Sequence, residues 1–136
     1  MNGYVTFTMD GRLLAGRLDE VREVVRATGI ESLAGARAPV TGLLVLRGQP
    51  VPVVDLRSGD GDPTAPGDVL VLQVADGVLG LAVDKVVAVL AETDLVPAEG
   101  QRSLGLPAYV LEVRRDAAKA PVFVVSLTAL AGLVSA

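Results

Sequence analysis

The amino-acid sequence predicts a mainly β fold, and three observations support this prediction. β-Branched residues gather in short runs, and Gly, Pro and Asp separate these runs. Helical patterning is weak, so the hydrophobic residues, which make up 51% of the chain, have to be buried mainly by strands. A chain of 136 residues can hide roughly 68% of its extended surface on folding. We therefore expect one packed domain.

The runs predict nine strands. In chain order they are Tyr4–Met9, Leu13–Leu18, Leu43–Leu46, Val51–Leu56, Val69–Ala75, Val78–Val83, Val86–Leu90, Ala108–Val113 and Pro121–Ser126. Three connections place a glycine where a tight turn can use a positive φ angle, namely Asp10-Gly11, Arg47-Gly48 and Asp76-Gly77. We expect an antiparallel hairpin at each of these connections.

Three further segments are not predicted as simple strands. Asp19–Ala27 has a spacing that fits a helical stripe but also a turn followed by a strand, so both readings stay open. Ser58–Asp68 is rich in Gly, Pro and Asp and is predicted to be an exposed loop. Ser126–Leu133 is predicted to be a short helix over an open end of the β structure, with Ser126 or Thr128 as its N-cap. No internal repeat is strong enough to assert.

The composition excludes several classes of function. Histidine and cysteine are both absent, which rules out Cys/His zinc sites, disulfides, thiol nucleophiles and catalytic triads that use imidazole. A net charge of −4 opposes binding to nucleic acid. The start of the chain does not resemble a signal peptide, and no apolar run reaches the roughly 18 residues that a membrane span needs. We therefore expect a cytoplasmic protein without membrane insertion.

The remaining residues give little support to an enzyme. A Ser/Lys hydrolase would need Lys85 or Lys119 beside a serine, and no Gly-x-Ser-x-Gly motif is present. Asp55 and Asp84 each end an apolar strand, where an aspartate more commonly caps a turn than binds a metal. Catalytic residues, metal ligands and cofactors are therefore not predicted.

The segment Gly42–Arg57, GLLVLRGQPVPVVDLR, has the most distinctive pattern. It resembles the signature of the CheW family, in which a Gly-apolar-Asn-Leu-Arg-Gly hairpin precedes an apolar strand reading V-P-(V/I)-V-D-L. Val21–Val25 upstream and Gly80–Val86 downstream are similar to two further family segments. Because all three stand in the family's order, the chain resembles a somewhat divergent CheW-like protein over nearly its whole length.

This resemblance implies a fold and a function. The fold is expected to be two small five-stranded SH3-like β-barrels around a shared core, with one or two short helices, interleaved into a single domain over residues 1–136. The function is expected to be that of a non-enzymatic adaptor that couples chemoreceptors to the histidine kinase CheA in chemosensory arrays. The implied partners are the cytoplasmic tip of a chemoreceptor and the regulatory domain of the kinase.

The resemblance also implies site residues. The receptor-binding groove is expected to comprise Val21, Glu23, Arg47, Gly48, Val86 and Val89. The structural signature of the hairpin and strands is expected to comprise Gly42, Leu46, Pro52, Asp55, Gly80 and Asp84. We expect Glu23 and Arg47 to lie within salt-bridge reach, although an ordinary solvated turn arginine is the alternative. For the valines, the alternative is a place in the core.

Two of the departures from the family pattern bear on the function. Val45 stands where the family usually has Asn, and Arg114–Lys119 replaces a Leu-Asp-Gly turn. Both favour an alternative function, that of a divergent CheW-like module that binds a receptor or another scaffold without engaging the kinase.

Overall fold

The structure, a computed structural model, describes residues 2–32, 34–35, 40–55, 67–74, 77–98 and 105–132. The prediction of a mainly β fold is confirmed, and each predicted strand begins within two residues of an observed one. The elements are β1 (Gly3–Met9), β2 (Arg12–Arg17), η1 (Leu18–Glu20), β3 (Val21–Arg26), β4 (Glu31–Ser32), β5 (Gly42–Leu46), β6 (Gln49–Asp55), β7 (Asp68–Val74), β8 (Gly77–Val83), β9 (Lys85–Ala91), η2 (Glu92–Asp94), β10 (Val96–Pro97), β11 (Val110–Arg115), β12 (Pro121–Val125) and α1 (Leu127–Leu130). No helix within these ranges is long and apolar enough to cross a membrane.

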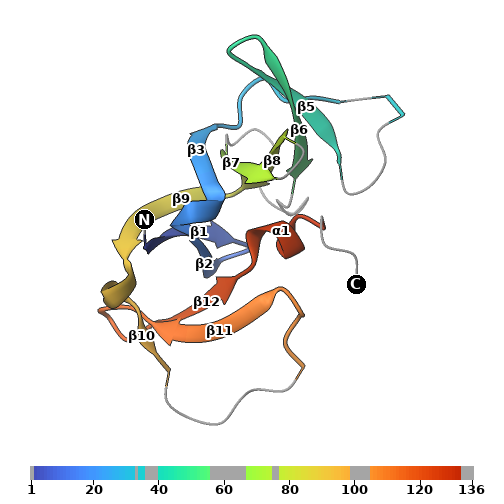
Figure 1. Cartoon of the computed structure of the whole chain (residues 1–136). Helices are drawn as coiled ribbons and strands as arrows, with labels where there is room; N and C mark the ends of the chain where they lie inside the picture. The colour runs from blue at the N-terminus through green and yellow to red at the C-terminus, as the bar shows by residue number, and fades with distance from the viewer. Residues whose placement is uncertain are drawn as a thin grey trace.

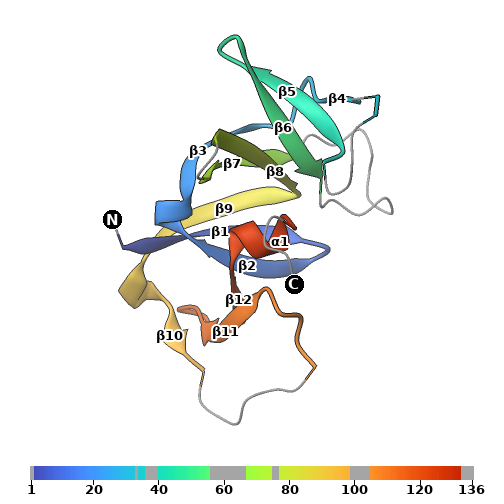
Figure 2. The ribbon, with the colours of Figure 1, turned by 45° about the vertical axis from the view of Figure 1, so that its right-hand side comes forward.

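The strands form two six-stranded sheets, one in each of two lobes (Figures 1 and 2). The terminal lobe has the strand order β10-β11-β12-β2-β1-β9, and the central lobe has the order β3-β7-β8-β6-β5-β4. Each lobe contains five strands of five or more residues and one edge strand of two residues, β10 or β4. The expectation of five strands in each lobe therefore holds once these short edge strands are set apart.

The two halves of the chain repeat one series of elements. β1–β6 form a hairpin, a single strand, a short strand and a second hairpin, and β7–β12 do the same. The first hairpin of each half joins the other half's sheet, because β1 pairs with β9 and β7 pairs with β3. Parallel pairing of β12 with β2, and of β6 with β8, completes the exchange. Neither half of the chain can therefore complete a lobe by itself.

The strand registers show that this repeat is close. β1 and β2 pair Tyr4 with Arg17, and β7 and β8 pair Val69 with Ala82, so both members of the pair are displaced by 65 positions. The same displacement relates β3 to β9 and β4 to β10. Most residues that it aligns differ in type, which is why the sequence pattern did not reveal the repeat.

The core has a centre that both lobes share. One face of β1 and one face of β7 contribute Phe7 and Leu72 to this shared cluster, and both side chains are fully buried. The opposite faces point into the interior of each lobe, where Tyr4 joins the terminal-lobe cluster and Val69 joins the central-lobe cluster. Strands buried on both faces need nearly continuous apolar sequence, which accounts for the apolar runs along β1 and β7.

Two segments of the prediction are corrected or decided by local hydrogen bonds. Asp19–Ala27 is a turn followed by a strand, because η1 leads directly into β3. The strand predicted over Ala108–Val113 begins two residues later and continues to Arg115. Its first residues are instead part of a turn in which the Val110 N–H donates to the Pro107 carbonyl at 3.0 Å.

The predicted C-terminal helix is α1, and Ser126 is its N-cap. The Ser126 Oγ accepts the Ala129 N–H at 3.3 Å, which satisfies one of the free donors at the start of a helix. Leu133 and most of the predicted loop Ser58–Asp68 lie outside the described residues, although Asp68 itself begins β7.

Two of the predicted turns have the expected backbone. Asp10 and Gly11 have φ angles of 52° and 78°, and Arg47 and Gly48 have φ angles of 50° and 79°. Two successive positive φ angles define the type I′ turn, which suits the twist of an antiparallel hairpin. Asp76, in the third predicted turn, lies outside the described residues, but β7 and β8 on either side of it do pair antiparallel.

Candidate functional site

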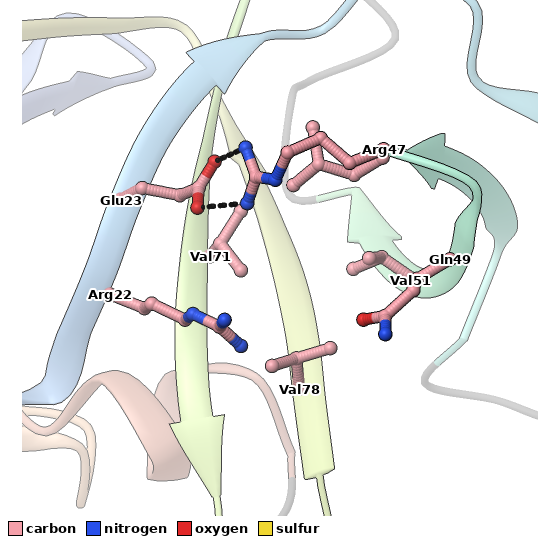
Figure 3. A pocket seen from close by; sticks show the side chains of 8 residues that line it. Arg22, Glu23, Arg47, Gln49, Val51, Val71 and Val78 are labelled. Atoms are coloured by element: carbon pink, nitrogen blue, oxygen red, sulfur yellow. Dashed lines mark hydrogen bonds and ion pairs between the residues drawn. The ribbon is translucent and has the colours of Figure 1, made fainter.

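The hairpin of β5 and β6 holds an arginine in a conformation that arginine rarely adopts. Arg47 lies in the left-handed region, which is uncommon for residues other than glycine, asparagine and aspartate. Figure 3 shows that its side chain extends toward Glu23 on β3. The type I′ turn requires a positive φ angle at this position, so the hairpin itself accounts for the conformation.

Arg47 and Glu23 form a bidentate ion pair. The Arg47 Nη1 donates to Glu23 Oε1 at 2.9 Å, and Nη2 donates to Oε2 at 2.5 Å (Figure 3). The predicted contact between these two residues is confirmed. The Arg47 side chain is 64% exposed and that of Glu23 is 25% exposed. The hydrogen bonds from Arg47 hold the pKa of the Glu23 carboxyl below its usual value.

The ion pair lines a pocket in the central lobe. We call this pocket the arginine pocket. Its volume is about 170 Å³. Buried valines from β6 and β7 lie at its base, and charged or amide side chains surround them (Figure 3). The lining residues are Arg22, Glu23, Leu46, Arg47, Gln49, Val51, Val71 and Val78.

The other residues predicted for the receptor groove lie outside this pocket. Gly48 occupies the hairpin turn. Val21 and Val86 are half-buried and pack against the shared core cluster, whereas Val89 is 63% exposed. Burial alternates along β9, so Val86 and Val89 point to opposite faces of that strand. The structure thus unites Glu23 with Arg47 but not with the valines, whose role in receptor binding stays a prediction.

Three of the signature residues have clear structural roles. A Cβ atom at Gly42 would lie 2.8 Å from the Glu31 carbonyl oxygen, so only glycine allows β4 to approach β5 this closely. A Cβ atom at Gly80 would similarly crowd the side chains of Val69 on β7 and Val53 on β6. The Asp84 carboxylate accepts the Asp10 N–H at 2.8 Å, which ties the end of β8 to the turn between β1 and β2. This contact makes Asp84 a turn cap.

The remaining signature residues stabilise the hairpin of β5 and β6. Leu46 packs against the central-lobe cluster and also lines the arginine pocket. Pro52 lies opposite Leu43 in the ladder between the two strands. The Asp55 N–H donates to the Thr41 hydroxyl at 3.1 Å. These contacts fix the strand that follows the turn and so position the turn itself.

Sequence reasoning missed two polar residues of the pocket, Arg22 and Gln49. The register between β3 and β7 shifts between Val21 and Glu23, which leaves Arg22 as the extra residue of a β-bulge. A β-bulge changes the direction in which side chains point, and no sequence pattern predicted the bulge at Arg22. Gln49 directly follows the Arg47-Gly48 turn. Its closeness in sequence to Arg47 was the one indication that it would line the same pocket.

The pocket has donors for recognition but no obvious catalytic set. Its polar groups are two guanidinium groups, one amide and a carboxylate whose two oxygens already accept from Arg47. Across the described part of the chain, His, Cys, Asp and Glu nowhere gather in a group of three or more that would hold a metal ion. Such an arrangement is suited to contacting polar side chains of another molecule.

The fold and this site define a small two-lobed β domain with exchanged hairpins and an exposed ion pair at one hairpin turn. Residues 3–133 match the CheW-like domain, and the chain belongs to this family. It is 32% identical over 94 residues to a "Probable chemotaxis protein CheW" of Rhizobium etli, a match that covers 66% of this chain and only 61% of that relative. The fold is similar to the crystal structure of the scaffolding protein TtCheW from Thermoanaerobacter tengcongensis, with a TM-score of 0.70, 22% identity, and coverage of 93% of this chain and 89% of that one.

Proposed function

We propose that this chain is a non-enzymatic adaptor that couples the cytoplasmic tips of chemoreceptors to the regulatory domain of a CheA-type histidine kinase. Residues 1–136 act as one domain, and the protein works in the cytoplasm at chemosensory arrays. Membership of the CheW-like family supports the proposal. So does the similarity to one relative named for chemotaxis and to another described as a scaffolding protein.

The ion pair between Glu23 and Arg47 is the observation that carries this proposal. The repeat between the two halves of the chain makes Ala88 on β9 the counterpart of Glu23 on β3. The terminal lobe thus builds the same strand pairing without a carboxylate at this position. The pair is not a requirement of the lobe architecture, so we assign it to a contact with a partner.

Binding experiments with the two partners test the proposal. Isothermal titration calorimetry would measure binding of the full chain to a receptor cytoplasmic fragment and, separately, to the kinase regulatory domain. We expect binding to both. Arg47→Asn is the informative variant, because asparagine followed by glycine is a favoured type I′ turn and keeps the hairpin while removing the guanidinium. We expect about tenfold weaker binding of the receptor fragment. Unchanged binding by a folded variant would contradict the role given to Arg47.

A second candidate is a module that binds a receptor or scaffold but not the kinase, and the turn after β11 favours it. The Asp116 carboxylate accepts the N–H groups of Ala118 and Ala120, each at 2.9 Å, and Lys119 has a φ angle of 65°. This turn replaces the Leu-Asp-Gly turn of the family. Val45, which replaces the usual Asn of the family, is 60% exposed. Binding of the receptor fragment without binding of the kinase domain would establish this second function.

A further inference from the structure

We infer that the arginine pocket accepts an acidic side chain, aspartate or glutamate, from a protein partner, and that Arg22 determines this specificity. The inference rests on the proposed function in taking the partner to be a protein. It adds the chemistry of the contact and a residue to which the family resemblance assigned no role.

The charges of the pocket are unbalanced. Two guanidinium groups, those of Arg22 and Arg47, line it together with the single carboxylate of Glu23, which leaves one positive charge in excess. Both Glu23 oxygens accept from Arg47. Within the described ranges, Arg22 makes no hydrogen bond or ion pair, and its side chain extends over the pocket toward Val78 (Figure 3). Its N–H donors therefore face the pocket without an acceptor.

The size and base of the pocket favour one side chain over a larger ligand. A volume of about 170 Å³ is below the roughly 300 Å³ at which small-molecule pockets usually begin. Val51 and Val71 at the base are almost completely buried. Both guanidinium groups are solvent-exposed, so the preference for a carboxylate rests on charge-assisted hydrogen bonds rather than on exclusion of water. Gln49 adds an amide at the rim.

The terminal lobe provides a comparison within the same molecule. The pairing of β9 with β1 shifts at the point that corresponds to the bulge in β3, and Val87 is its extra residue. Both lobes therefore build the bulge, one with Arg22 and one with an exposed valine. Since the bulge forms without a charge, its geometry does not explain the arginine. Recognition of a negatively charged group does.

A peptide experiment tests this inference before the partner itself is identified. The probes are an acetylated and amidated pentapeptide with a central glutamate, and the same peptide with glutamine. Arginine Nε–H signals of the full chain would be followed by NMR at millimolar peptide. We expect the glutamate peptide to shift the Arg22 and Arg47 signals and to bind at least about fivefold more tightly than the glutamine peptide. Arg22→Gln should abolish the difference, whereas the control Val87→Gln should retain it.

Equal binding of the two peptides to the wild-type chain, or a preference that survives Arg22→Gln, would overturn the inference.

The protein partners give a second test. Arg22→Glu should weaken binding of the receptor fragment or of the kinase domain about tenfold. The charge-matched control Arg12→Glu, on β2 of the terminal lobe, should leave binding unchanged, and reversing the charge of one acidic residue of the partner should restore its binding to Arg22→Glu. If the wild-type chain binds neither protein, the proposed function fails, while the peptide result still decides the chemistry of the pocket. If Arg22→Glu bound both proteins as tightly as the wild-type chain does, the inference about the arginine pocket would also be contradicted.

Discussion

The two lobes share one construction but use their arginines differently. In the terminal lobe, the Arg114 side chain is only 18% exposed. Its guanidinium lies 5.8 Å from the centre of the Tyr4 ring, and its Nη1 donates to the Leu95 carbonyl at 3.0 Å. In the central lobe, Arg47 points outward and pairs with Glu23 at the pocket. One arginine therefore ties strands together inside its lobe, while the other is displayed at the surface. Within one repeated architecture, exposure separates the structural residue from the candidate binding residue.

Replacement of Leu127 by alanine should give the largest effect, because Leu127 is fully buried in the core cluster that both lobes share. A Cβ atom at Gly16 would lie 2.5 Å from the Leu127 Cδ1, so the space above this glycine is filled by the C-terminal helix. The central lobe has Leu81 at the corresponding position and fills the space locally. We expect Leu127→Ala to lower the free energy of unfolding by about 2–5 kcal/mol, as measured by urea denaturation.

A double variant sharpens this comparison. Gly16→Leu combined with Leu127→Ala gives the terminal lobe the arrangement of the central lobe, and we expect it to recover part of the lost stability. Gly16→Leu alone should be destabilising, since the new side chain meets Leu127. If the double variant were no more stable than the sum of the single effects predicts, the two positions would not be equivalent in packing.

Substitution of Arg114 should separate the two arginines. Arg114→Gln removes the ion pair with Glu112, the contact with Tyr4 and the hydrogen bond to Leu95, so we expect the free energy of unfolding to fall by about 1–3 kcal/mol. Partner binding should stay near the wild-type value when measured at a temperature where the variant is folded. Arg47→Asn should weaken binding of the receptor fragment and should lower the free energy of unfolding less than Arg114→Gln does, because its ion pair lies at the surface. A larger loss of stability in Arg47→Asn than in Arg114→Gln would contradict the division of roles.

The stability contributions of Glu20, at the end of η1, and of Glu23, in β3, should respond to pH with opposite signs. Burial raises the pKa of Glu20, although the Leu127 N–H, which it accepts at 3.2 Å, lowers it in part. The folded state therefore holds this proton more tightly, and the contribution of Glu20 to stability falls as pH rises above 4.5. Arg47 lowers the pKa of Glu23, so the contribution of Glu23 is present above 4.5 and is lost as pH falls through its lowered value.

Denaturation curves between about pH 3 and about pH 7 would test this contrast. The stability of Glu20→Gln relative to the wild type should increase with pH, whereas that of Glu23→Gln should decrease. The constant effect of the amide itself cancels, because only the change with pH is compared. Parallel pH profiles of wild type and both variants would show that neither carboxyl is perturbed by folding.

Sequence patterns were sufficient for local features and failed for features that depend on distant contacts. Alternating apolar runs and Gly-containing turns predicted the strands and hairpins, and the family signature predicted the contact between Glu23 and Arg47. The exchange of hairpins was not predictable from the runs, because any of several strands can supply the missing partner. The bulge at Arg22 and the packing of Leu127 on Gly16 arise only when distant segments meet, so no local pattern records them.

Thr6 gives the smallest predicted effect and the closest comparison of the lobe interiors. It is the one polar residue fully buried among the described residues, and its hydroxyl donates to the Ala88 carbonyl at 3.2 Å. The central lobe has Val71 at the equivalent position, facing Glu23 on β3. Thr6→Val exchanges a hydrogen bond worth about 1 kcal/mol for a buried methyl group worth about 0.8 kcal/mol. We expect the free energy of unfolding to change by less than about 1 kcal/mol.

The reverse exchange, Val71→Thr, decides whether the interiors are equivalent in hydrogen bonding as well as in shape. If they are, the new hydroxyl reaches the carbonyl of Glu23 as Thr6 reaches that of Ala88, and the cost stays similarly small. A loss of more than about 2 kcal/mol from Val71→Thr alone would mean that an unsatisfied hydroxyl had been buried. The strand β3 would then lie differently from β9 relative to its neighbouring strand, and we would attribute this to the ion pair between Glu23 and Arg47, which β9 lacks.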